Sequence, residues 1–464
     1  MSSTALAGRP ATGVGGKTWL TGGVAALAGL MFGLDIGVIS GALTFIRKDF
    51  GASDSAQEWI VSSMMFGAAL GALAAGYLSA SFGRKRSLVL SAVLFVASSL
   101  FCAFAWSIPA LIGARVILGL AIGIAAFTAP LYISEVADEA HRGSMISTYQ
   151  LMITIGILVA FISDALLAYS GAWRWMLGIV AVPGLMFLGA VFLLPDSPRW
   201  LKMKGRDAEA LQVLTDLRHN EHAAQREADD IAEQLTQTQH GWSLFTGNAN
   251  FRRSVLLGVL LQVMQQLTGM NVVMYYAPRI FQLAGFGQHA QSWGTAVVGV
   301  VNVLATFIAI GLVDRWGRRP MLVTGFLVMT LGMGILGTLI FAGIDSEIQR
   351  LLAIAVLLCF ITGFAFSAGP LIWVLCSEVQ PLKGRDFGIA CSTFTNWAAN
   401  FVVGVTFLTL LNTIGNAETF WLYAAFNALF ILVTLWLVPE TKGVSLEAIE
   451  RRLMAGQKLR NIGR

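Results

Sequence analysis

The sequence predicts an all-α membrane protein built from two similar six-helix bundles. Composition is the first reason: of the 464 residues, 56% are hydrophobic and only 12% are charged, whereas a soluble domain is about a quarter charged. The second reason is a set of motifs that occurs twice, in the same order and at nearly the same separation, which indicates two copies of one unit. The motifs are Gly83-Arg84, Glu135 with Arg142, and Pro195-Asp196-Ser197-Pro198-Arg199 in the first copy, and Gly317-Arg318, Glu378 with Arg385, and Pro439-Glu440-Thr441-Lys442 in the second.

Twelve segments are apolar enough and long enough to cross a bilayer, which takes about 20 residues. Backbone polar groups in lipid must be bonded within their own segment, so each is predicted to be a helix. The first segment is too long for the apolar core of a signal peptide, and no small-residue cleavage pattern follows it. The predicted spans are 19–46, 57–82, 87–106, 109–134, 144–169, 173–194, 252–281, 291–314, 320–343, 350–379, 386–412 and 418–438.

The distribution of basic residues predicts the orientation of the spans. Of the 31 Lys and Arg residues, one lies within a span and nearly all the others fall on one side. Basic loops stay in the cytoplasm, so both termini are predicted to be cytoplasmic. The net charge of +5 is then a sign of topology and does not indicate a nucleic-acid partner. The basic residues predicted on the opposite side are Arg47, Lys48, Arg174, Arg279 and Arg350.

This layout divides the chain into four parts. They are an N-terminal six-helix bundle over 1–198, a cytoplasmic linker over 199–250, a C-terminal six-helix bundle over 251–440 and a cytoplasmic tail over 441–464. Charge concentrates in the linker, where 207–218 and 221–238 are predicted as amphipathic helices that either brace the bundles or form a solvated connection. A short tail helix is predicted to begin near Ser445, a residue type that caps helix N-termini.

Paired charges mark the cytoplasmic ends of several predicted spans. Glu135 and Glu378 each lie a short loop away from an Arg. Ion pairs among these groups would hold the cytoplasmic face shut in one state and separate in another, which is a gate. Simple anchoring of basic residues at the membrane surface explains the Arg residues but leaves the Glu residues unexplained. The predicted gate residues are Arg84, Glu135, Arg142, Arg318, Glu378 and Arg385.

The motifs also carry a family resemblance. Gly119, Gly123, Tyr132, Glu135 and Arg142, together with the two proline motifs, resemble the sugar porter family of the major facilitator superfamily, from about residue 19 to the end of the chain. The runs at 33–37, 149–152, 265–271 and 395–397 look most like its bacterial proton-coupled members that carry galactose, with those that carry arabinose second.

The resemblance implies the major facilitator fold and a monosaccharide importer that works by alternating access. It implies a sugar:proton symporter for a hexose of the galactose or glucose type. A proton symporter for arabinose or another pentose, and a facilitated sugar uniporter, remain as alternatives. The expected setting is the bacterial inner membrane, and the expected partners are a sugar, protons and the lipid bilayer, with the protein a monomer.

Two charged residues stand out within the spans, Asp35 and Arg115. A lone charge in hydrocarbon costs about 2.5–3.5 kcal/mol even on the lenient scale, so such residues survive when they are paired. We hypothesise that Asp35 carries the proton and that Arg115, which never titrates in proteins, is its partner. The proton-coupled sugar porters carry this Asp and Arg at these positions, so the resemblance implies the same roles. A purely structural ion pair is the alternative.

The second half supplies most candidates for a sugar site. A neutral sugar needs amides, which both donate and accept, and an aromatic ring to stack on. Such a site is expected midway across the membrane, where the halves meet, beside helices interrupted by Gly or Pro. Amides within spans also join helices to one another, which is the alternative for any single residue. The candidates are Gln150, Ile157, Gln265, Gln266, Asn271, Asn302, Trp373, Asn396 and Trp397, with Tyr275 and Asn400 as further possibilities.

Other classes of protein fit the sequence less well. A membrane enzyme needs catalytic acid–base groups or metal ligands in its spans. One Asp and one Arg make up neither a catalytic acid–base set nor a metal site. The four cysteines lie in apolar segments and are predicted to be packing residues, without disulfide or zinc-ligand spacing. We therefore predict that the chain is not an enzyme and uses no cofactor or metal, the proton being its coupling ion.

Overall fold

The computed structural model describes the chain except for residues 1–15, 138–141, 237–240, 382–383, 445 and 464. The described residues form helices and connecting turns without a strand, and twelve helical segments are long and apolar enough to cross a membrane. The predicted all-α class and the number of spans are confirmed.

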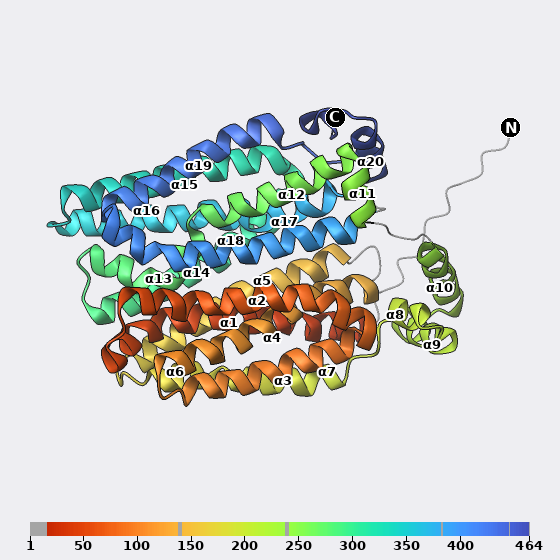
Figure 1. Ribbon diagram of the computed structural model, residues 1–464, viewed down its shortest axis with the longest axis horizontal. Helices are drawn as coiled ribbons and strands as arrows, with labels where there is room; N and C mark the ends of the chain where they lie inside the picture. The colour runs from red at the N-terminus through yellow and green to blue at the C-terminus, as the bar shows by residue number, and fades with distance from the viewer. Residues whose placement is uncertain (1–15, 138–141, 237–240, 382–383, 445, 464) are drawn as a thin grey trace.

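Two bundles lie side by side along the long axis of the molecule (Figure 1). The first contains α1 Gly16–Phe50, α2 Asp54–Phe82, α3 Arg84–Ala103, α4 Ile108–Val136, α5 Arg142–Leu167, α6 Trp173–Ile179 and α7 Ala181–Phe192. The second contains α12 Ala249–Leu267, α13 Met270–Leu283, α14 Gln288–Trp316, α15 Arg318–Ala342, α16 Glu347–Phe366, α17 Ala368–Glu378, α18 Arg385–Thr413 and α19 Asn416–Leu437.

The remaining helices gather at one end of the bundles, on the right in Figure 1, which we call the linker end. They are α8 Pro198–Met203, α9 Asp207–Arg218, α10 Glu221–Thr236, α11 Gly241–Gly247 and α20 Leu446–Met454. The opposite end, which holds the turns after α1, α5 and α13, is called the far end. The two linker helices occur as predicted, and α20 begins directly after Ser445, which itself lies outside the described residues.

The linker is attached to both bundles. Arg218 of α9 donates a hydrogen bond to the Val136 carbonyl of α4 at 2.9 Å and pairs with Glu227 of α10 at 2.7 Å. On the other side, Trp242 and Phe245 of α11 contact the Phe387 ring of α18. Helix α9 therefore contacts the first bundle and α11 contacts the second, while bracing of both bundles by the helices predicted over 207–218 and 221–238 stays a prediction.

Glycines let the helices of the first bundle approach closely. Gly29, Gly33, Gly37 and Gly41 recur every four residues on the face of α1 that meets α5. A Cβ atom on Gly33 would collide with the Ile153 carbonyl oxygen, so α1 and α5 touch backbone to backbone at this point. Close backbone contact of this kind is the main source of helix association where lipid removes the hydrophobic driving force. It holds α1, which carries Asp35, in one fixed rotation.

Two spans of the second bundle are interrupted within their length. The break between α12 and α13 falls at Gly269, whose φ of 89° is accessible to glycine without strain. The break between α16 and α17 falls at Ser367, so that Pro370 lies in the first turn of α17. A proline is tolerated there because the first turn has no intrahelical use for its missing N–H. At the second interruption, the carbonyls of Ala368 and Gly369 lie beside Gln265, one of the amides predicted to bind sugar.

Candidate functional site

The two buried charges of the first bundle form an ion pair between α1 and α4. Arg115 approaches Asp35 with both terminal nitrogens, Nη1 to Oδ1 at 3.2 Å and Nη2 to Oδ2 at 3.4 Å, and both side chains are fully enclosed. The Arg115 Nε donates at 2.6 Å to the Ile60 carbonyl of α2. The guanidinium is therefore held by α2 independently of Asp35, so the carboxyl can gain a proton while its partner stays in place.

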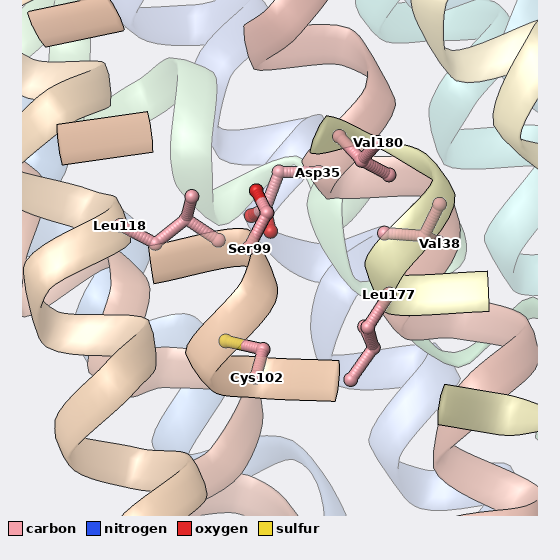
Figure 2. A pocket seen from close by; sticks show the side chains of 7 residues that line it. All are labelled: Asp35, Val38, Ser99, Cys102, Leu118, Leu177 and Val180. Atoms are coloured by element: carbon pink, nitrogen blue, oxygen red, sulfur yellow. The ribbon is translucent and has the colours of Figure 1, made fainter. Parts of the chain in front are cut away.

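A small cavity lies against the Asp35 carboxyl (Figure 2). Its volume is about 10 Å³, which is close to the least that a single water molecule occupies. Helices α1, α3, α4 and α6 form its walls, all of them from the first bundle. The cavity beside Asp35 is thus lined by residues of the first bundle alone. The other lining residues are Val38, Ser99, Cys102, Leu118, Leu177 and Val180.

Several predicted sugar ligands come together around the break between α16 and α17. The Gln265 amide donates to the carbonyls of Ala368 and Gly369 at 2.9 and 3.0 Å. Asn396 of α18 donates to Gln265 Oε1 at 2.8 Å and to Gln262 Oε1 at 2.7 Å. Gln262, which the sequence analysis did not single out, is therefore part of the same network. The network ties α12 and α18 to the first turn of α17, the second part of the broken span.

The break between α12 and α13 gathers a second set of predicted residues. Asn271 donates to Gln266 Oε1 across the Gly269 turn. Tyr275 and Asn400, the further possibilities of the sequence analysis, are also joined, because the Asn400 amide donates to the Tyr275 hydroxyl at 3.3 Å. Polar side chains of α12, α13 and α18 are thus bonded to one another within the second bundle.

Three predicted ligands keep polar groups available. Gln150 on α5 is half-buried, Asn302 on α14 is buried, and Trp373 on α17 is 38% exposed. Among the residues that the structure describes, the side chains of these three make no hydrogen bond to another part of the chain. Helices α5 and α14 pack together, since a Cβ on Gly299 of α14 would lie 3.1 Å from Leu158 of α5. Gln150 and Asn302 therefore belong to the helix pair that joins the two bundles.

Two other predicted residues lie in contact regions between helices. The Trp397 ring of α18 packs on the Phe32 ring of α1, with centroids 5.2 Å apart, and so bridges the bundles. Ile157 is buried in the core, where its backbone faces Gly33 and Gly37 of α1. The structure shows where both lie, and their part in a sugar site stays a prediction.

The predicted gate residues form matching triads at the linker end. In the first bundle, Arg84 forms a bidentate ion pair with Glu135, with N···O distances of 2.7 and 2.8 Å. The Ser197 hydroxyl donates a hydrogen bond to the same carboxylate at 2.5 Å. In the second, Arg318 pairs with Glu378 at 3.0 Å and Thr441 donates at 2.5 Å. The hydroxyls come from the two proline motifs, so the repeated sequence signature builds a repeated structure.

Both ion pairs join residues within one bundle, so neither links the first bundle to the second. Arg385 donates at 3.0 Å to the Ser377 carbonyl of its own bundle. Arg142 begins α5, and its side chain lies outside the described residues. The pairs therefore fix the linker end of each bundle, and their separation during a change of state stays a prediction.

Contacts between the bundles occur at the far end. Tyr169 accepts a hydrogen bond from Trp293 at 3.1 Å and stacks on His289 with centroids 4.7 Å apart. Glu58 of α2 accepts two hydrogen bonds from Thr409 of α18, at 2.7 and 2.8 Å. These contacts hold the far ends of the two bundles together in this conformation.

Sequence reasoning missed two buried carboxyl groups. Asp164 on α5 accepts a hydrogen bond from the Gly41 amide at 3.1 Å and is 3% exposed, and Glu58 is 2% exposed. Both lie near the ends of predicted spans, where charged residues are common and usually reach water. These carboxyl groups are buried only because a neighbouring helix packs over them. The sequence pattern of one segment does not reveal that contact.

Comparisons with known proteins agree with this architecture. A family model described as "Sugar (and other) transporter" matches residues 22–453. The galactose-proton symporter of Escherichia coli K12 is 65% identical over 441 residues, covering 95% of each chain. The arabinose-proton symporter of the same strain is 56% identical over 443 residues, covering 95% of this chain and 94% of the relative.

Solved structures of a xylose transporter have the same fold. The partially occluded, inward-open conformation of XylE from E. coli superposes with a TM-score of 0.81 at 30% identity, covering 92% of this chain and 99% of that one. XylE as a proton:xylose symporter bound to 6-bromo-6-deoxy-D-glucose gives a TM-score of 0.78 at 31% identity, covering 93% and 98%.

Proposed function

Because the chain belongs to the sugar transporter family, we propose that it imports a monosaccharide together with a proton by alternating access. The observation that carries this proposal is the enclosed Asp35–Arg115 pair beside a second bundle rich in amides. Asp35 is the member that takes up and releases the proton, since an arginine does not titrate in proteins. A facilitated uniporter needs no such carrier.

The proton acts through the attraction between α1 and α4. In the ionised state, the buried charges of Asp35 and Arg115 compensate one another across the contact at 3.2 Å. A proton on Asp35 removes that attraction, while Arg115 keeps its bond to the Ile60 carbonyl. The two helices are then free to shift, and the shift alters which side of the membrane the central site faces. Release of the proton on the other side restores the pair.

The sugar site lies where α5, α14, α17 and the amide networks of the second bundle meet. Gln150, Asn302 and Trp373 offer polar groups that bond to no other side chain or backbone group in the described part of the chain, and Trp373 adds an aromatic surface for the sugar ring. Gln265, Gln266, Asn271 and Asn396 offer amides whose present bonds can be exchanged for sugar hydroxyls at little net cost, because one hydrogen bond replaces another. Trp397 and Ile157 would shape the wall near α1.

The linker end faces the cytoplasm in this proposal, with both termini inside and the protein a monomer in the bacterial inner membrane. The basic residues of the two gate triads, at this end, support that orientation. A hexose of the galactose type is the proposed substrate, because the galactose-proton symporter is 65% identical to this chain. A pentose such as arabinose is the second candidate.

The function is tested with purified protein in proteoliposomes. With acid outside, we expect labelled galactose to accumulate, and we expect addition of the sugar to make the outside medium more alkaline as protons enter with it. Galactose and glucose should compete more strongly than arabinose and xylose. Sugar uptake that equilibrates without moving protons would identify a uniporter, and the absence of uptake for every sugar in the panel would contradict the proposal.

Truncation of two central side chains tests the sugar site. Gln266→Ala removes a polar anchor and Trp373→Ala removes the stacking surface, so we expect each to raise the sugar Kd by about tenfold or more, since every 1.4 kcal/mol is a factor of ten. Sugar binding is measured by calorimetry on the purified variants. Gln282→Ala on α13 and Trp436→Ala on α19 are matched controls, because both side chains are exposed away from the site. Unchanged affinity in both test variants would contradict this site.

A further inference from the structure

A carboxylate of the first bundle grips the backbone of the second at the far end. Glu58 Oε1 accepts from the Thr409 amide at 2.7 Å, and Oε2 accepts from the Thr409 hydroxyl at 2.8 Å. Glu58 is only 2% exposed, although it lies one turn from the start of α2. One side chain thus joins two bundles that must separate at this end during alternating access.

The turn of α18 that bonds to Glu58 also accepts a hydrogen bond from its own bundle. In an ideal helix, the Leu408 amide bonds to the Gly404 carbonyl. That carbonyl accepts a hydrogen bond from the Tyr276 hydroxyl of α13 at 3.0 Å. At this turn the backbone of α18 therefore donates from Thr409 to α2 and accepts at Gly404 from α13. Gly404 itself has no side chain to separate α18 from Ser62 of α2, where a Cβ would lie 3.4 Å away.

A buried carboxylate held in this way is sensitive to its charge. Hydrogen bonds to an ionised acceptor are roughly twice as strong as neutral ones, and burial of the charge is tolerated only while the donors are present. A proton on Glu58 removes the charge and occupies one acceptor oxygen. The contact with α18 then becomes an ordinary neutral contact, and separation of the far ends costs less.

We propose that Glu58 is a proton-sensitive latch: its ionised form keeps the far end closed, and its protonation favours opening of that end. This inference rests on the proposed function, in which the far end faces the acidic side. There, acid would favour the state that loads sugar and proton together. Glu58 is a positioning residue, since it controls how closely α2 and α18 are held together and does not touch the sugar.

Several other charged and titratable groups surround the latch. On α2 itself, Asp54 lies one turn away, bonds to Asn412 of α18 at 2.9 Å and sits 3.8 Å from Arg47 of α1. From α13, the Tyr276 hydroxyl faces the same turn of α18. From α4 and α1, Arg115 and Asp35 lie behind Ile60. The described charged residues of α3 and α18 lie at the linker end. Asp35 and Asp54 are therefore the groups that an experiment must separate from Glu58.

Distances between spin labels at the far end test the latch. Labels are placed on cysteines introduced at Ser170 and Asp345, exposed loop positions in the first and second bundle, with Cys359 and Cys391 replaced by serine. The full-length protein in nanodiscs is measured by pulsed electron resonance at pH 8 and pH 5. We expect the far-end-open share to rise on acidification. Glu58→Gln should raise the open-to-closed ratio at pH 8 by about tenfold, since the charge-assisted bonds become neutral.

An Asp35→Asn background removes the other proton site. In that background the pH response should persist, should vanish when Glu58→Gln is added, and should survive Asp54→Asn. Thr409→Val, which removes only the hydroxyl donor, should shift the ratio in the same direction by about threefold. It keeps the test available if Glu58→Gln does not fold.

Two results would overturn the latch. One is an unchanged ratio at pH 8 in both Glu58→Gln and Thr409→Val. The other is a full pH response in the Asp35→Asn/Glu58→Gln double variant. Sugar binding is measured on the same samples: a chain that binds no sugar contradicts the proposed function, whereas one that binds sugar without a latch response contradicts only this inference.

Discussion

Replacement of Asp35 by Asn is expected to abolish accumulation of sugar against its gradient while leaving exchange of sugar across the membrane intact. Asn has nearly the same shape and can still accept from Arg115, but it cannot take up a proton. One charge moved through 100 mV supplies about 2.3 kcal/mol, which supports an accumulation of about 40-fold. In the variant, the internal sugar concentration should rise only to the external one. Uptake and counterflow in proteoliposomes measure the two activities separately.

Other carboxyl groups of the first bundle serve as controls for this variant. Asp49 is an exposed carboxyl on the same helix as Asp35, and it pairs with Arg174 of α6 at 2.9 Å. Asp49→Asn should therefore keep full accumulation of sugar. Asp164 is buried but faces a backbone amide in place of a cation. If accumulation survived in Asp35→Asn and disappeared in Asp164→Asn, the proton site would lie on α5 and the assignment of Asp35 would be wrong.

Replacement of Gly33 by Val is expected to disrupt the first bundle. The new Cβ would collide with the Ile153 carbonyl oxygen and lie 2.9 Å from the Ile157 amide nitrogen, both of them backbone atoms that cannot rotate away. Overpacking of a tight core costs about 1–3 kcal/mol, and here α1 must also move from α5, which displaces Asp35 from Arg115. We expect a large loss of monodisperse protein in detergent and a lower unfolding temperature.

Gly23→Val is the matched control on the same helix. Gly23 is exposed, and a Cβ there would meet nothing within 4 Å. Both variants have the same intrinsic effect on helix propensity, so their difference measures packing alone. Equal unfolding temperatures for the two variants would show that the close contact of α1 with α5 contributes little to stability.

Much of the candidate site was predictable because it involves residues that are unusual for their surroundings. Asp35 and Arg115 are charges in apolar segments, and a requirement for pairing follows from the cost of burying each alone. Repetition marked the Arg and Glu residues of the triads as candidates, but it did not show that Arg84 pairs with Glu135 or that Arg318 pairs with Glu378. The hydroxyls of Ser197 and Thr441 were not predicted. The repeat indicated that these motifs have equivalent roles in the two halves of the chain.

The amide network was predictable in composition but not in arrangement. Gln265, Gln266, Asn271 and Asn396 could be identified as polar groups in apolar spans. Their bonds to one another, to Gln262 and to the carbonyls of Ala368 and Gly369 beside the break at Ser367 could not be predicted. A helix presents each side chain in a direction that depends on its rotation, and that rotation is set by packing against neighbours far away in the sequence.

The sequence by itself determined the number of spans, the duplication and two of the buried charges, Asp35 and Arg115. These follow from transfer free energies and motif order, which are properties of each segment taken alone. Only the tertiary structure decided which groups meet: Arg115 with Asp35 within one bundle, and Glu58 with Thr409 across two. Glu58 illustrates the physical reason. A carboxylate one turn from a helix end is ordinary in a sequence, and it becomes a buried charge that joins two bundles only because α18 packs over it.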